Sequence, residues 1–407
     1  MNKKIMALAV ASAFAAPAVA LAQSSTVQIY GTAYIEYGYA KQGMGAVGGL
    51  NNTDLLQTPG SNIGFKGEEN LGGGLSAWFN CESSLDFRGA GSQPLPATSP
   101  TQNSGILCGR NSALGLKGAF GNVFAGNWDT PWKQASPKII GTNETGVFGG
   151  SPMLYGNSTS ANDSDNGVVF ERRQGNSLHY RSPTWSGFDF GLTVSTPQRN
   201  VGLSSNATVG KPRLWSAGVN YTNGPLLLTA NYEKHNNFNA LNGNPISNNT
   251  TTAALGGTSD DGYMLGAAYQ FGPVKAGVVW AKRNLDSGAG TDASVSTYGL
   301  NLDWAIQGPH QLKFAYLVAN STTGSFGANT ANGTTVGNLV MNRGAGSTGG
   351  SMWEVEYLYN LSKRTRVSFG YVAVSNDLYA KYSVGGFTTP TAGTSQSAFG
   401  TSIKSAF

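Results

Sequence analysis

The chain has 407 residues, with 26 Lys or Arg against 21 Asp or Glu, which gives a formal net charge of +5 at pH 7. This positive excess is too small to indicate a nucleic-acid-binding protein. Only 12% of the residues are charged, 11% are aromatic and 57 are glycines, and no linker or break in composition divides the chain into domains.

The N-terminal segment predicts a secretory signal peptide. Two lysines precede an apolar run over residues 5–16, and a small-residue Ala-Leu-Ala sequence ends at Ala22. The alternative, a membrane anchor, is disfavoured because the run is shorter than the roughly 20 residues that a spanning helix needs. We therefore expect residues 1–22 to be removed and residues 23–407 to form the mature protein, whose formal charge is +3 after the loss of two lysines.

Beyond the signal peptide, apolar and polar residues alternate one by one in many short segments. Near the C-terminus, Trp353, Val355 and Tyr357 alternate with Glu354 and Glu356. Because successive side chains of a strand point to opposite faces, the first set is expected to meet lipid and the second to line a polar interior. Sixteen such strands are predicted, in chain order at 26–40, 61–68, 75–85, 109–117, 122–129, 176–181, 189–195, 214–222, 226–235, 261–271, 274–285, 293–304, 310–319, 351–361, 366–376 and 396–407.

The connections between these strands alternate between short turns and long segments. The long segments lie near 86–108, 130–175, 236–260 and 320–350. An even number of strands with this alternation predicts an all-β protein, a 16-stranded antiparallel transmembrane β-barrel with short turns in the periplasm and long loops outside. A helical membrane protein is excluded, because no later stretch is apolar over the length of a spanning helix. A polar interior inside an apolar exterior indicates a pore.

Five segments resemble the general porins of Gram-negative outer membranes, especially those of the β-proteobacterial branch. They are residues 27–31, 63–75, 110–118 and 177–183 and the terminal Phe407, and their order and spacing cover essentially the whole mature chain. The resemblance implies a homotrimeric outer-membrane porin, surrounded by lipid and lipopolysaccharide, through which small hydrophilic solutes and ions diffuse passively. It implies no cofactor and no enzymatic activity.

The resemblance also implies that the third long loop, roughly residues 130–175, folds into the barrel and narrows it, since a barrel of this size is otherwise an open hole. Basic residues on the wall would face acidic residues on the loop, and the field between them would orient solutes. Arg110 and Arg173 occupy the positions of two wall arginines of the family. The other candidates for this constriction are Lys66, Lys117, Arg172, Arg181, Asp129, Glu144 and Phe148.

The loop departs from the family pattern at Val147, where relatives carry a glutamate. Glu144 and Asp129 are the two candidates to replace it, and Asn62 stands where some relatives carry a third arginine. With one carboxylate lost and at least two arginines kept, we expect a modest preference for anions. One charge pair in water is worth only ~1 kcal/mol at ~4 Å, so these charges tune selectivity rather than create it.

The sequence leaves open which way the side chain of Arg110 points. On a regular strand over 109–117 it would share the lipid-facing side of Leu114 and Leu116. A β-bulge would restore an inward direction, and the alternative is a solvent position at the upper rim. For Lys66 and Lys117, the alternative to a role in the constriction is that they are ordinary lysines of the wall or of a turn.

Two further features concern export and assembly. Cys81 and Cys108 bracket the first long loop on the apolar sides of neighbouring strands, and an exported protein in an oxidising compartment would pair them in a disulfide. The resemblance implies that Phe407, a C-terminal aromatic, is recognised by the outer-membrane assembly machinery.

Sites for catalysis or metal binding are not expected. None of His179, His235 and His310 stands next to a nucleophile motif, and with two cysteines they have no zinc spacing. Residues 163–167 resemble a calcium loop only superficially, since the distant glutamate is absent. The alternatives to a passive porin are a substrate-specific barrel, a barrel serving adhesion or integrity and, more remotely, an enzyme. A ladder of stacked aromatic residues inside the barrel would favour the substrate-specific channel.

Overall fold

The structure is a computed structural model in which the described residues are 27–43, 52–88, 107–141, 146–150, 170, 172–196, 213–236, 259–286, 292–324, 334–336, 339–341, 347–387 and 390–407. The predicted signal peptide, the candidate Glu144 and residues 163–167 lie outside these ranges. In the described part of the chain, no helix combines the length and the apolar character needed to cross a membrane.

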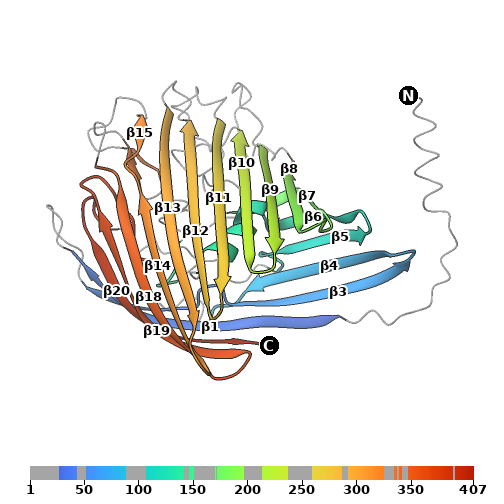
Figure 1. Cartoon of the computed structure of the whole chain (residues 1–407), viewed down its shortest axis with the longest axis horizontal. Coiled ribbons are helices and arrows are strands. Elements are labelled where there is room, and N and C mark those ends of the chain that lie inside the picture. The colour runs from blue at the N-terminus through green and yellow to red at the C-terminus, as the bar shows by residue number, and fades with distance from the viewer. Residues whose placement is uncertain are drawn as a thin grey trace.

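Sixteen long strands make up the barrel wall. They are β1 (Gln28–Gln42), β3 (Asn62–Gly72), β4 (Leu75–Ser84), β5 (Ser112–Gly118), β6 (Gly121–Asp129), β7 (Arg173–Arg181), β8 (Phe188–Ser195), β9 (Arg213–Asn223), β10 (Leu226–Asn236), β11 (Ser259–Phe271), β12 (Val274–Asp286), β13 (Asp292–Ala305), β14 (His310–Ala319), β18 (Gly350–Asn360), β19 (Thr365–Asn376) and β20 (Gln396–Ala406). Each pairs antiparallel with the next along the chain, and β1 pairs with β20 from Thr32↔Ala406 to Gln42↔Gln396. The ring is therefore closed, as predicted, with no free edge (Figure 1).

Four short strands accompany the wall. β2 (Thr53–Gln57) pairs with the upper part of β1, from Glu36↔Gln57 to Ala40↔Thr53, and so continues the line of β3 beyond a break at residues 58–61. β15 (Thr323–Gly324) extends the pairing of β13, while β16 (Thr334–Val336) and β17 (Leu339–Met341) form a separate hairpin. One barrel strand is therefore bent where it approaches the outer loops.

The predicted strands agree with the observed ones within three residues except at the end of 61–68, and three of the differences bear on the site. The predicted strand 61–68 extends to Gly72, because the tight turn is made by Gly73 and Gly74, both with positive φ. The predicted strand 109–117 begins only at Ser112, so the residues before it are free of the strand's alternation. The third loop ends before Arg173, where β7 begins, so Gly175 belongs to the wall rather than to the loop.

The two faces of the wall separate as the sequence pattern predicts. On β18, Trp353 is 40% exposed on the outer face, whereas Glu354 and Glu356 are almost fully buried on the inner face. On β9, Trp215 and Val219 are exposed while Ser216 and Asn220 are buried. An apolar outer face exposed on every strand is what a barrel surrounded by lipid requires.

The third long loop begins with a helix inside the barrel. α2 (Pro131–Ile139) starts at Thr130, whose side chain accepts a hydrogen bond from the backbone N–H of Lys133, and Pro131 follows where no N–H is needed. The helix lies against the inner faces of β9, β10 and β11 and buries Trp132 and Ile139 completely. The inward-folded loop implied by the family resemblance is therefore present.

Inward-facing glycines make room for this helix. A Cβ atom on Gly266 would lie 2.8 Å from a side-chain carbon of Ile139, and one on Gly299 would lie 2.8 Å from a side-chain carbon of Ile140. At Gly277 the obstacle is the backbone itself, because a Cβ atom there would lie within clashing distance of the carbonyl oxygen of Ile139. Glycine at these positions lets the loop backbone approach the wall closely.

The last loop, between β19 and β20, also folds inward. Tyr382, Val384 and Phe387 are buried within it, and Asn376 holds it by donating hydrogen bonds to the carbonyls of Tyr382 and Thr394, both at 2.8 Å. Since this loop is in contact with the backbone of Gly146, the tip of the third loop is covered on its outer side. The sequence pattern did not reveal this inward fold, since the 19 residues of the loop, 377–395, show no regular alternation of polar and apolar side chains.

Candidate functional site

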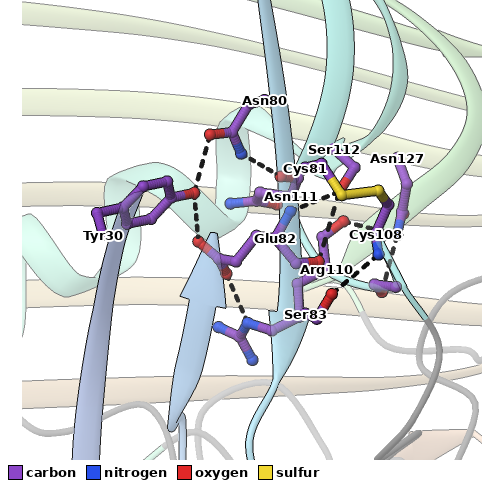
Figure 2. The surroundings of a disulfide bond; sticks show 11 residues. Tyr30, Asn80, Cys81, Glu82, Ser83, Cys108, Arg110, Asn111, Ser112 and Asn127 are labelled. Carbon is purple, nitrogen blue, oxygen red and sulfur yellow. Dashed lines mark hydrogen bonds and ion pairs between the residues drawn. A yellow bond between two sulfur atoms is a disulfide. The ribbon is translucent and has the colours of Figure 1, made fainter. Parts of the chain in front are cut away.

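Arg110 lies in a network on the inner side of the wall. Its Nε donates to Glu82 at 2.5 Å, and Glu82 alternates on β4 with the outward Cys81 (Figure 2). The other carboxylate oxygen of Glu82 accepts from the hydroxyl of Tyr30 at 3.1 Å, and Asn127 donates to the backbone carbonyl of Arg110. Arg110 therefore needs no β-bulge to turn inward, because the strand starts two residues later and Glu82 holds the guanidinium.

Arg173 belongs to a second, adjacent group. Its side chain lies 3.2 Å from the carboxylate of Asp129 and donates to Asn111 at 2.7 Å. Asn111 in turn donates to Asp129 at 2.7 Å, so the amide bridges the two charged groups. Both ends of the third loop are fixed here, because Asp129 ends β6 and Arg173 begins β7.

The remaining basic candidates are distributed along the same part of the wall. Lys66 lies 5.2 Å from the centre of the Tyr30 ring, and Lys117 forms an exposed ion pair with Glu68 near the short turns. The guanidinium of Arg181 and the ring of Pro131, at the start of α2, both lie over the inward Gly191. Arg172 is 2% exposed, and its carbonyl accepts from the backbone N–H of Thr130. The structure thus brings all six cationic candidates to β3–β7 and their immediate neighbours.

Phe148 lies at the tip of the third loop but does not face open space. Its ring is fully buried against the inward glycines Gly370 and Gly400 on the opposite wall. The backbone N–H of Val147 donates to the carboxylate of Glu36 at 2.9 Å. Relatives carry a glutamate on the loop at position 147; here the carboxylate next to this position is that of Glu36 on the wall. The loop tip is anchored by this hydrogen bond and by the Phe148 ring.

Cys81 and Cys108 form the predicted disulfide, with a Cα–Cα distance of 4.6 Å (Figure 2). Cys108 is not on a strand: it occupies a turn with a φ of 60°, and its N–H donates to the hydroxyl of Ser83 at 3.0 Å. Nearby, the hydrogen-bonded Arg88 lowers the pKa of Asp86 to about 2, so this carboxylate stays ionised at any pH near neutrality. The base of the first long loop is therefore tied down at both ends.

We expect reduction of this disulfide to loosen the first long loop. Closing a loop with a sequence separation of 27 residues stabilises the folded chain by about 3–4 kcal/mol relative to an open one. Dithiothreitol should therefore lower the temperature at which the folded barrel unfolds on a gel and should expose the loop to protease. The double variant C81S/C108S is the control: it should show both changes without reductant and no further response to it.

His179 is a buried residue on the inner face of β7. It hydrogen-bonds Ser177 at 2.7 Å through Nε2 and Thr193 at 2.8 Å through Nδ1, and its ring stacks on Phe124 at 4.7 Å. Both nitrogens are thus occupied by hydroxyl groups in a buried position. Within the described residues, no group of three or more His, Cys, Asp or Glu side chains could hold a metal ion.

The sequence reasoning missed Glu82, Asn111 and Glu36, which are the partners of the arginines and of the loop tip. A usable signal was present for Glu82, since it is an acid on the inward side of a strand opposite Arg110. No such signal existed for Asn111, because its role depends on the meeting of β6 and β7.

Comparison with known proteins identifies the family. The family model of Gram-negative porins matches residues 7–398. The chain belongs to the Gram-negative porin family. It is 27% identical over 326 residues to the outer membrane porin protein 32 of Delftia acidovorans, which covers 78% of this chain and 79% of that protein. It is 25% identical to a monosaccharide porin of a Halomonas species, over 81% of this chain and 86% of that protein.

Solved structures agree on the fold. An anion-selective porin from Comamonas acidovorans superposes with a TM-score of 0.67 at 21% identity, covering 94% of this chain and 100% of that structure. Together with the family match, this makes the protein an outer-membrane channel for passive diffusion of small hydrophilic solutes rather than an enzyme.

Proposed function

We propose that this porin passes small solutes through a constriction formed by Arg110, Arg173 and the other basic side chains of β3–β7, with a modest preference for anions. The observation that carries the proposal is the charge on this part of the wall. Among the described residues of this part of the wall, Arg110, Arg173 and Lys117 are each paired with one carboxylate, whereas Lys66 forms no ion pair and leaves a positive surplus. A local surplus of positive charge attracts anions into a water-filled passage.

The surplus is partly masked, which sets the expected size of the preference. Arg110 and Arg173 each lie against a carboxylate, so their fields fall off faster than those of isolated charges. A preference of a few-fold follows, since unpaired charges in water contribute only ~1 kcal/mol each. The same proposal includes an acid on the third loop: either Glu144 or Asp129 replaces the glutamate that relatives carry at position 147, and Asp129 would act through its pair with Arg173.

The test is the reversal potential of single channels in a planar bilayer under a KCl gradient. Stepwise ohmic openings with a reversal potential on the anion side are the expected result. A reversal potential on the cation side would show that the carboxylates dominate. Folded protein that gives no openings would instead favour a barrel serving adhesion or integrity.

The proposal includes assembly. Export would proceed by cleavage of residues 1–22, and residues 23–407 would assemble as a homotrimer in contact with lipid and lipopolysaccharide. Exposed apolar side chains surround the whole described barrel, so part of this outer surface is available to neighbouring subunits. Cross-linking of the purified protein, read as the number of linked subunits, tests the trimer.

Deletion of Phe407 is expected to reduce the yield of folded barrel in the outer membrane several-fold. Its backbone exchanges two hydrogen bonds with Gly31, at 3.0 and 3.1 Å, and its ring covers Gly31 on the outer face. The residue thus completes the seam between β1 and β20, in addition to the proposed recognition by the assembly machinery. Phe407→Tyr is the control and should keep the yield; an unchanged yield after deletion would contradict both roles.

A further inference from the structure

A cavity of about 440 Å³ lies inside the barrel between the short turns and the Asp129–Arg173 pair. Its lining includes the side chains of Lys66, Trp78, Asn80, Lys117, Asn122 and Trp128, which come from β3–β6. These residues alternate with outward ones on their strands, and Lys117 pairs with Asn122 two residues from the turn. The cavity is therefore on the short-turn side of the charged groups described above.

Two indole rings form the apolar side of this cavity. The rings of Trp78 and Trp128 lie 5.7 Å apart at 73° to each other, and both contact Phe124 at 5.3 Å. Phe124 is itself buried and stacks on His179. Because Trp78 also donates to Asn122 at 2.8 Å, its ring is held in place. Partly exposed, fixed indole faces bind planar apolar groups at little cost in side-chain entropy.

The cavity also carries charged side chains that determine which ligand charge it favours. Lys117 is paired with Glu68, so these two groups nearly cancel. Lys66 forms no ion pair within the described ranges, and its ammonium group lies 5.2 Å from the centre of the Tyr30 ring. One uncompensated ammonium group beside two indole faces is complementary to a planar ring that carries a single carboxylate.

We infer that this cavity is a binding site for small aromatic carboxylates on their way through the barrel. The ring of the solute lies against Trp78 and Trp128, and its carboxylate lies toward Lys66. The inference rests on the proposed function, because it gives the class of solute that the passive channel retains briefly. Lys66 thereby gains a role that differs from the general field of the constriction.

The experiment uses benzoate as the probe and single wild-type channels in KCl as the starting state. Benzoate should interrupt the current in a saturable way, and acetate at the same concentration should not, because it has the charge without the ring. Interruptions should begin at lower concentration when benzoate is added on the short-turn side, since that route avoids the constriction. Equal interruption by acetate, or none by benzoate, would overturn the inference.

Substitutions of Trp78 test whether benzoate binds in this cavity. Trp78→Leu should raise the half-saturating benzoate concentration about two- to twelvefold, because a lost aromatic contact is worth about 0.5–1.5 kcal/mol. Trp78→Phe keeps a ring and should lie between the two, which also covers the case in which the leucine variant folds poorly. Trp304→Leu is the matched control, because Trp304 is 44% exposed on the outer face at the same end of the barrel and should leave benzoate binding as it is.

The charge is tested in the same way. Lys66→Met should weaken benzoate about fivefold and leave neutral benzyl alcohol unaffected, since a single charge in water is worth about 1 kcal/mol. Lys363→Met, in the exposed turn after β18, is its control. Stronger interruption by glucose than by benzoate would assign the cavity to neutral sugars and overturn the anion part.

Calorimetric titration of the folded protein with benzoate separates this inference from the proposed function. If channels never open, but benzoate binds and the Trp78→Leu substitution weakens its binding, the inferred binding site is supported and the channel proposal fails. If channels open normally and benzoate does not bind, the cavity inference fails alone.

Discussion

Gly277→Val is expected to lower the single-channel conductance substantially while the barrel still folds. A Cβ atom at this position would meet the carbonyl oxygen of Ile139, at the end of α2. Overpacking of this kind costs about 1–3 kcal/mol. A loop helix yields more readily than a strand that is hydrogen-bonded on both sides, so the helix end should move away from the wall and into the passage.

The neighbouring Ala276 provides the control for this variant. It is on the same strand but on the outer face, next to the exposed Val278. Ala276→Val adds the same branched side chain toward lipid and should leave the conductance as in the wild type. Folding of both variants is read from the gel shift on heating. A Gly277→Val channel with wild-type conductance would show that α2 does not rest on this glycine.

Arg173→Gln is expected to shift the reversal potential toward cations. The guanidinium lies 3.2 Å from Asp129, so its removal takes away the ion partner of that carboxylate, while the more distant Lys133 and Arg110 remain. At about 1 kcal/mol per charge in water, the permeability ratio should change several-fold. The shift should be large at low salt and small in 1 M KCl, where screening acts over about 3 Å.

The partner variant gives the opposite sign. Asp129→Asn removes the carboxylate and keeps Arg173, so the reversal potential should move toward anions. Lys363→Gln, in the exposed turn after β18, changes the net charge by the same amount as Arg173→Gln and should have little effect. If Lys363→Gln and Arg173→Gln act equally, net charge rather than the local pair determines selectivity.

The barrel could be predicted strand by strand because its pattern is local. Whether Trp353 faces lipid and Glu354 the interior follows from alternation within a few residues, and the structure agrees. The start of β5 could not be predicted in this way. Alternation extends past Ser112 to Arg110 in the sequence, but the chain leaves the strand there because Cys108 is tied to Cys81 and Arg110 to Glu82.

The candidate site was predictable in residue type and less so in partners. Arg110 and Arg173 were identified by their positions in a family pattern, and the structure brings them to one part of the wall. Their partners, Glu82 and Asn111, are 28 and 62 residues away in sequence. Phe148 was assigned to the passage because of the loop that carries it, yet its ring is buried against Gly400.

The amino-acid sequence by itself determined the sixteen strands, their lipid-facing sides and the pairing of the only two cysteines, because each depends on period, count or compartment. Only the tertiary structure decided how the interior is filled: α2 against Gly277, the loop tip on Glu36, and the last loop over Gly146. These contacts join segments far apart in the chain. They depend on shape and on single hydrogen bonds, which leave no periodic trace in the sequence.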